Sequence, residues 1–137
     1  MSDRGWPALG TKPFGLQRLT WTGATPFEIL AVRARKDGFR VEFTRPADPA
    51  TLARLDSWAW ESWTYELHSD YGSDPFALQV PVTRRATPSA DGTAVDLVVD
   101  GLREGYVHAL TAAGVRDAAG APLVHAQAFT TLLRRPR

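Results

Sequence analysis

Three side chains with the chemistry of a hydrolytic site stand side by side at His68-Ser69-Asp70. A serine nucleophile needs a base within hydrogen-bond reach and a third group that orients this base. Such partners converge from separate segments of a fold, so adjacency in sequence does not indicate a triad. No serine lies in a G-x-S-x-G turn, and neither a P-loop nor a G-x-G-x-x-G motif occurs. The residues therefore predict no catalytic site and no cofactor.

The three histidines, His68, His108 and His125, are the candidate metal ligands. No two of them have the i, i+4 spacing of a zinc-binding helix, but ligands in a β-domain come from different strands. His68, Asp70 and His108 therefore stay candidates. Strand alternation places His108 on the inward face, where a hydrogen bond to a backbone carbonyl explains a histidine without a metal. The oxygen-rich segment Asp70–Asp74 lacks the spacing of a calcium-binding EF-hand loop and favours a capped turn.

Aromatic residues are concentrated between positions 58 and 71: Trp58, Trp60, Trp63, Tyr65 and Tyr71. Trp58 and Trp60 share one strand phase and Trp63 and Tyr65 the other, so large rings are expected on both faces. A sandwich strand buries one face only, which would leave some rings exposed. Exposed Trp and Tyr suit a protein interface and also stacking against a sugar. We therefore expect these five residues to include core rings together with interface or ligand candidates.

Composition limits the kind of molecule that must position these groups. The chain has 137 residues, 44% of them hydrophobic, which fits one domain with one core. The net charge is +1, so no electrostatic attraction to nucleic acid is expected. The absence of cysteine excludes disulfides and thiolate ligands. No apolar window is long enough to insert into a membrane.

Short alternating runs predict an all-β fold. In the clearest run, Phe39, Val41 and Phe43 alternate with polar residues, and Asp37-Gly38 before it is a hairpin turn pair. Asp48 can cap a short helical turn near 49–55, with Pro49 at its first position. A phase slip near Glu61-Ser62 predicts a bulge or bend. Further strands are expected over 15–22, 27–35, 79–86, 94–99, 106–112 and 126–133.

Strands at this spacing leave no room for helical crossovers, and they are typical of an antiparallel β-sandwich. We predict an immunoglobulin-like sandwich of about seven to nine strands over residues 15–133. Residues 1–14 read as a linker or N-terminal arm. Residues 134–137 form a basic tail of the kind that is usually a solvated end.

Several pieces occur in an order that resembles bacterial Ig-like domains of the surface-layer type. They are the strand and turn of Asp37–Asp48, Ser89–Gly92 before Val95–Val99, Leu102–Tyr106, Gly114–Leu123 and Phe129–Thr131. Together they cover most of the chain, from about Phe27 to Leu133. The resemblance implies the same sandwich fold.

A narrower resemblance rests on Gly15–Gly23, Pro26–Ile29, Tyr71–Ser73 and Gly105–His108. These segments look like the C-terminal module of secreted, membrane-bound dehydrogenase-like proteins, which pair a β-propeller with a cytochrome c domain. The resemblance implies a position after a catalytic or electron-transfer domain. Neither the propeller nor a CxxCH haem motif is present in these residues, so redox activity does not carry over to them.

The expected function is that of a non-catalytic accessory module that packs against a neighbouring domain or another protein. A carbohydrate-binding module that uses exposed aromatics is the alternative, and a small metal-binding or hydrolytic domain is a third class. The N-terminus lacks the basic and apolar blocks of a signal peptide. The residues are therefore either cytoplasmic or a domain of a longer exported chain. The resemblance to secreted proteins implies the second, with a periplasmic or extracellular location as part of a longer parent chain.

Overall fold

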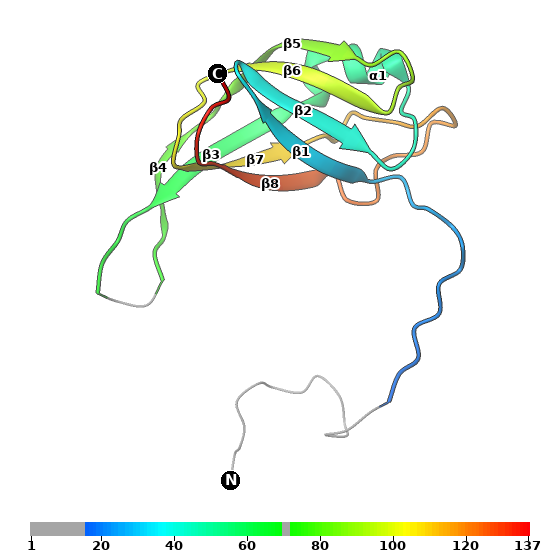
Figure 1. Cartoon of the computed structure of the whole chain (residues 1–137), viewed down its shortest axis with the longest axis horizontal. Helices are drawn as coiled ribbons and strands as arrows, with labels where there is room; N and C mark the ends of the chain where they lie inside the picture. The colour runs from blue at the N-terminus through cyan, green and yellow to red at the C-terminus, as the bar shows by residue number, and fades with distance from the viewer. Residues whose placement is uncertain (1–15, 70–71) are drawn as a thin grey trace.

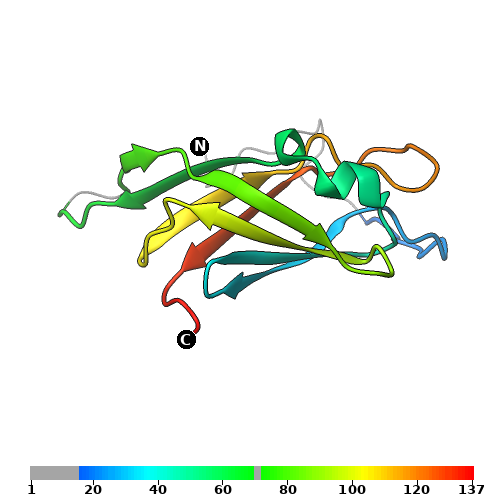
Figure 2. The same ribbon diagram turned by 90° about the horizontal axis from the view of Figure 1, so that it is seen from above.

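Alternating inward and outward side chains build eight strands that lie in two facing antiparallel sheets (Figures 1 and 2). The computed structural model describes residues 16–69 and 72–137. One sheet has the order β1-β2-β6-β5 and the other the order β4-β3-β7-β8. The strands are β1 (Ile29–Arg35), β2 (Gly38–Phe43), β3 (Ala59–Tyr65), β4 (Pro75–Gln79), β5 (Val82–Pro88), β6 (Ala94–Asp100), β7 (Tyr106–Thr111) and β8 (Gln127–Leu132). The predicted all-β sandwich is confirmed.

The predicted hairpin at Asp37-Gly38 joins β1 to β2, and Arg35 pairs with Gly38 across it. Gly38 also pairs with Val98 of β6, so this glycine stands between two strands. A Cβ atom at position 38 would lie 1.7 Å from the backbone carbonyl oxygen of Leu97. Position 38 therefore requires glycine, because the backbones of β2 and β6 approach too closely there for a side chain.

The core lies between the sheets and is filled from both. Phe39 of β2 stacks on Trp60 of β3, with ring centroids 5.2 Å apart. Phe27 packs against Phe43 at 5.8 Å and closes the end of the core at which the chain enters β1. The other buried apolar residues include Val41, Leu52, Val95, Leu97, Val99, Leu110, Val115 and Leu132.

A short helix caps one end of the sandwich, as the sequence predicts. α1 (Pro49–Ala53) begins after Asp48, whose carboxylate accepts a hydrogen bond of 2.9 Å from the backbone N–H of Ala50. The 3-10 turn η1 (Leu55–Ser57) follows and delivers the chain to β3. α1 buries Leu52, so this helical segment closes the core.

Two strand expectations fail. Residues 16–22 form no strand, because a strand needs a partner for its backbone groups and none of the described strands pairs with this segment. The predicted strand over 79–86 is instead interrupted at Val80-Pro81, where the chain crosses from β4 in one sheet to β5 in the other. Gly15, Asp70 and Tyr71 lie outside the described residues.

The irregularity expected at Glu61-Ser62 occurs one residue further on and in one ladder only. β3 pairs regularly with β7 from Ala59 to Trp63. On its other side, the pairing with β4 shifts between Ser62 and Thr64. Ala77 of β4 accommodates this shift with a positive φ of 53°.

Candidate interaction surface

Trp58 and Trp60 lie in the core instead of on a binding surface. They are 5% and 3% exposed. The indole N–H of Trp58 donates to the carbonyl oxygen of Leu52 at 3.1 Å, and that of Trp60 donates to the hydroxyl of Thr83 at 2.9 Å. Each buried indole therefore has its hydrogen-bond partner. Almost all of each ring is therefore enclosed by the core, although both rings border a hollow at the edge of the sandwich.

Trp63 and Tyr65 point to the other side of β3, onto the outer surface of the second sheet. Register places Trp63 opposite Val107, and Ala109 opposite both Glu61 and Phe129. We call the surface formed by Trp63, Tyr65, Val107, Ala109 and Phe129 the apolar face. Tyr65 is 52% and Phe129 63% exposed. Tyr71, the fifth aromatic candidate, lies outside the described residues.

Phe129 is the aromatic member of this surface that was not among the sequence-based candidates. Its ring meets Trp63 edge to face, with centroids 6.4 Å apart at 71°. The two residues stand on strands separated by β7, so no local spacing links them. The outward phase of β8 was the available signal, since Phe129 alternates with the buried Leu132 side of the strand. The indole nitrogen of Trp63 is buried and has no hydrogen-bond partner among the residues the structure describes.

The apolar face continues into a groove at the open edge of the sandwich. A hollow of about 370 Å³ over the face is lined by Ala59, Trp60, Glu61, Val80, Ala109, Thr111, Gln127 and Phe129. A second hollow of about 600 Å³ shares Ala59, Trp60 and Val80 with it and extends to Leu55 and Val82. We call this second hollow the edge groove. Glu61 is the ionisable residue of the first hollow.

The outer face of the first sheet has the opposite character. Arg33 bonds Glu42 at 2.9 Å and Arg40 bonds Asp96 at 2.7 Å, with Arg35 3.8 Å from Asp96. Hydrogen bonding from Arg33 lowers the pKa of the Glu42 carboxyl. Exposed pairs of this kind contribute little to stability, but a charged sheet face resists association. The two outer faces of the sandwich are therefore chemically distinct.

The candidate metal ligands are distributed over different environments. His108 is fully buried on β7, where its Nδ1 lies 3.1 Å from the carbonyl oxygen of Tyr106. His68 is exposed in the loop between β3 and β4, and Asp70 lies outside the described residues. His125 contacts the Glu28 carboxylate at 2.6 Å. Within residues 16–69 and 72–137, no group of three or more His, Asp or Glu side chains is placed to hold a metal ion.

Two of the surface-layer-type sequence pieces meet in space and have a structural role. Ala47 forms a β-bridge with Asp117, and Arg45 pairs with the same Asp117 carboxylate at 2.8 Å. That carboxylate also accepts hydrogen bonds of 2.9 Å from the backbone N–H groups of Ala119 and Ala121. These contacts around Asp117 link two loops at one end of the sandwich, and we call them the Asp117 clasp.

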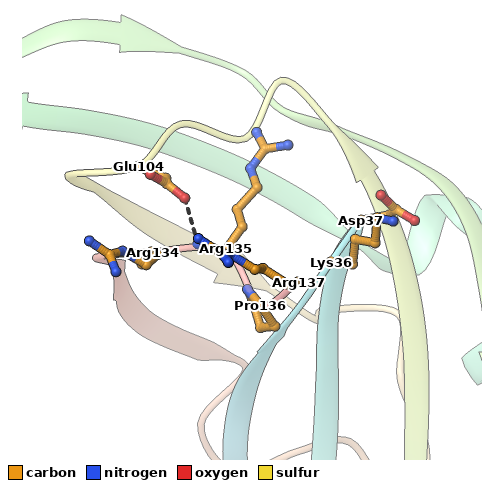
Figure 3. Close-up of a pocket in the computed structure, with 7 residues that line it drawn as sticks. All are labelled: Lys36, Asp37, Glu104, Arg134, Arg135, Pro136 and Arg137. Atoms are coloured by element: carbon orange, nitrogen blue, oxygen red, sulfur yellow. Dashed lines mark hydrogen bonds between the residues drawn. The ribbon is translucent and has the colours of Figure 1, made fainter.

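The basic tail folds back over the other end of the domain (Figure 3). The backbone N–H of Arg135 donates to Glu104 at 2.6 Å, and its guanidinium donates to the carbonyl of Leu102. A hollow of about 520 Å³ lies between the tail and Lys36-Asp37 of the β1–β2 turn. The side chains of Arg134 and Arg135 point in different directions, so they do not converge on one anion.

Comparisons with known proteins identify the fold. No protein-family model matches the chain, and no curated protein sequence does either. Solved structures of a bacterial S-layer protein match most of the length of this chain. The chain shares its fold with part of SbsC. The N-terminal part of SbsC aligns with a TM-score of 0.57 at 17% identity, covering 77% of this chain and 23% of that one.

Two further SbsC structures agree. Domains 1-6 of this surface layer protein align with a TM-score of 0.57 at 18% identity, covering 77% of this chain and 13% of that one. The S-layer protein rSbsC(31-844) aligns with a TM-score of 0.58 at 17% identity, covering 78% and 14%. The chain therefore spans less than a quarter of each of these SbsC chains. Among the helices of the described residues, none is long and apolar enough to cross a membrane.

Proposed function

We propose that this chain is a non-catalytic, Ig-like accessory domain of a larger exported bacterial protein, and that it acts by packing its apolar face against a neighbouring domain or protein. The observation that carries the proposal is the contrast between the two outer faces. Phe129 and Tyr65 are exposed beside Trp63 on one sheet, while arginine–carboxylate pairs cover the other. Exposed aromatic clusters of this kind mark interaction sites.

The fold comparison supports the accessory part of the proposal. The chain matches a small part of much longer S-layer protein chains. A position beside a catalytic or electron-transfer domain, which the narrower sequence resemblance implies, belongs to the same proposal. Trp58 and Trp60 are already used by the core, which leaves fewer rings for the carbohydrate-binding alternative.

Hydroxyl-radical footprinting tests this proposal. Tyr65 and Phe129 should be oxidised in the isolated chain, kept dilute enough to be monomeric, and protected in the native exported protein that contains it. Leu30, which is exposed on β1, is the matched control and should react equally in both. Equal oxidation of Tyr65 and Phe129 in the two samples would contradict the proposal. A tryptophan fluorescence response to a soluble glycan, lost in a Tyr65→Ser variant, would favour carbohydrate binding instead.

A further inference from the structure

An apolar arm leads into the sandwich and is hydrogen-bonded to it at Pro26, its last residue. Residues 16–26, which we call the arm, extend away from the domain before β1 (Figure 1). Leu16, Leu19 and Trp21 of the arm are 101%, 96% and 72% exposed. The arm has the β-forming composition that predicts a strand, yet none of the strands that the structure describes pairs with it. Three large apolar side chains in one short exposed segment indicate a surface that another molecule covers.

The root of the arm is firmly attached, so its direction is set by the fold. The hydroxyl of Thr44 donates to the carbonyl oxygen of Pro26 at 2.6 Å and accepts from the backbone N–H of Glu28 at 3.0 Å. The buried Phe27 accepts a hydrogen bond of 3.1 Å from the N–H of Val124. These bonds fix the point at which the arm leaves the sandwich.

The arm and the apolar face complement each other. The arm places Arg18 among its apolar side chains, and the face places Glu61 among its own. An extended segment of about seven residues spans roughly 23 Å, whereas four neighbouring strands span roughly 14 Å. The arm is thus long enough to cross from the edge groove to Phe129. Both surfaces are apolar, and each carries a charge opposite to that of the other.

From these observations we propose that the arm of one copy binds the apolar face and edge groove of a second copy. The inference rests on the proposed function, because it names the partner of the same face. The arm and the face are different surfaces, so the contact is heterologous and each copy keeps one free arm and one free face. Contacts of this kind build rings or open chains of subunits instead of closed dimers.

Sedimentation velocity of the whole chain, up to near-millimolar concentration, tests the inference with three variants. An arm variant carries Leu19→Ser and Trp21→Ser, a face variant carries Phe129→Ser, and Leu30→Ser is the control. The wild type and the control should form species larger than a dimer. The arm and face variants should each associate at least about tenfold more weakly, as expected for the loss of central apolar anchors. In dilute, monomeric samples all of them should have urea midpoints near that of the wild type, because each substituted side chain is more than half exposed.

An equimolar mixture of the arm variant and the face variant gives the decisive result. One supplies an intact face and the other an intact arm, so the mixture should form a one-to-one dimer and nothing larger. Self-association of the arm variant without rescue by mixing would indicate a symmetric face-to-face contact and overturn the inference. A wild type that is monomeric at every concentration would also overturn it. If Tyr65 and Phe129 were nevertheless protected in the native exported protein, the proposed function would stand with a different partner.

Discussion

The indole N–H of Trp60 donates a hydrogen bond of 2.9 Å to the hydroxyl of Thr83, and this bond joins the two sheets. Trp60 belongs to β3 in one sheet and Thr83 to β5 in the other. Both side chains are buried, so water cannot replace either partner. The bond therefore fixes the position of one of the two core indole rings relative to the sheet that it faces.

Thr83→Val is expected to destabilise the domain by about 1–3 kcal/mol, because the buried indole N–H loses its acceptor while the side-chain volume is kept. Thr83→Ser retains the hydroxyl and should lose less. Urea unfolding followed by tryptophan fluorescence measures both. Equal stability of the wild type and Thr83→Val would show that the indole finds another acceptor.

Gly38→Ala should be the most damaging single methyl addition in the hairpin. The new Cβ would meet the carbonyl oxygen of Leu97 at 1.7 Å, so β2 and β6 must separate. We expect a loss above about 4 kcal/mol, or failure to fold. Gly105→Ala is the comparison: its Cβ meets nothing within 4 Å, and its φ of 80° costs about 1–2 kcal/mol. Similar thermal midpoints for the two variants would contradict this account.

His108 should make stability fall in mild acid. Burial lowers the pKa of His108 below its ordinary value of 6.5, partly offset by its hydrogen bond to Tyr106 and reinforced by the charge of Arg135. The unfolded chain takes up a proton at this histidine below pH 6.5, and the folded chain resists it. The free energy of unfolding should therefore be unaffected above that pH and decrease below it, by up to about 1.4 kcal/mol per pH unit.

Urea midpoints at about pH 7.5 and about pH 5.5 measure the effect of this one proton. His108→Gln should reduce the difference between the two midpoints. His68→Gln is the matched control, since His68 is exposed in a loop, and it should leave the difference unchanged. A full acid-induced loss in His108→Gln would assign the effect to other groups.

Asp117→Ala should open the clasp between the two loops. It removes the acceptor for the N–H groups of Ala119 and Ala121 together with the ion pair to Arg45. We expect a loss of about 1–3 kcal/mol. Asp117→Asn keeps an acceptor oxygen and gives up only the charge, so it should retain most of the stability. Hydrogen exchange at residues 116–122 would localise the change, and unaltered exchange there would refute the clasp.

The sequence was informative where the cause of structure is local. The alternation of Phe39, Val41 and Phe43, the Asp37-Gly38 turn and the Asp48 cap each depend on a few adjacent residues, and each was predicted. The phase of Trp58 and Trp60 was visible as well. Their burial was not, because it depends on which face of β3 meets the other sheet.

The missed features all depend on partners that are distant in the chain. Phe129 reaches Trp63 only through the register of β7, and the crossing at Val80-Pro81 depends on where each sheet ends. Residues 16–22 have the composition of a strand, but composition does not supply the second strand. A periodic pattern shows that a segment can form a strand. Whether the strand forms depends on a partner strand that the rest of the fold must place beside it.

The routes by which the chain enters and leaves the sandwich have a mechanical consequence. The chain enters β1 at one end of the sandwich and leaves β8 at the opposite end (Figures 1 and 2). Tension between those two points would run along the strands, across hydrogen bonds that lie perpendicular to them. The hydrogen bonds of the β1–β2 ladder would then be loaded together in shear, and so would those of the β7–β8 ladder. In unzipping, by contrast, the bonds break one at a time. Under tension in this direction, the domain should therefore resist unfolding more strongly than if it were pulled apart strand by strand.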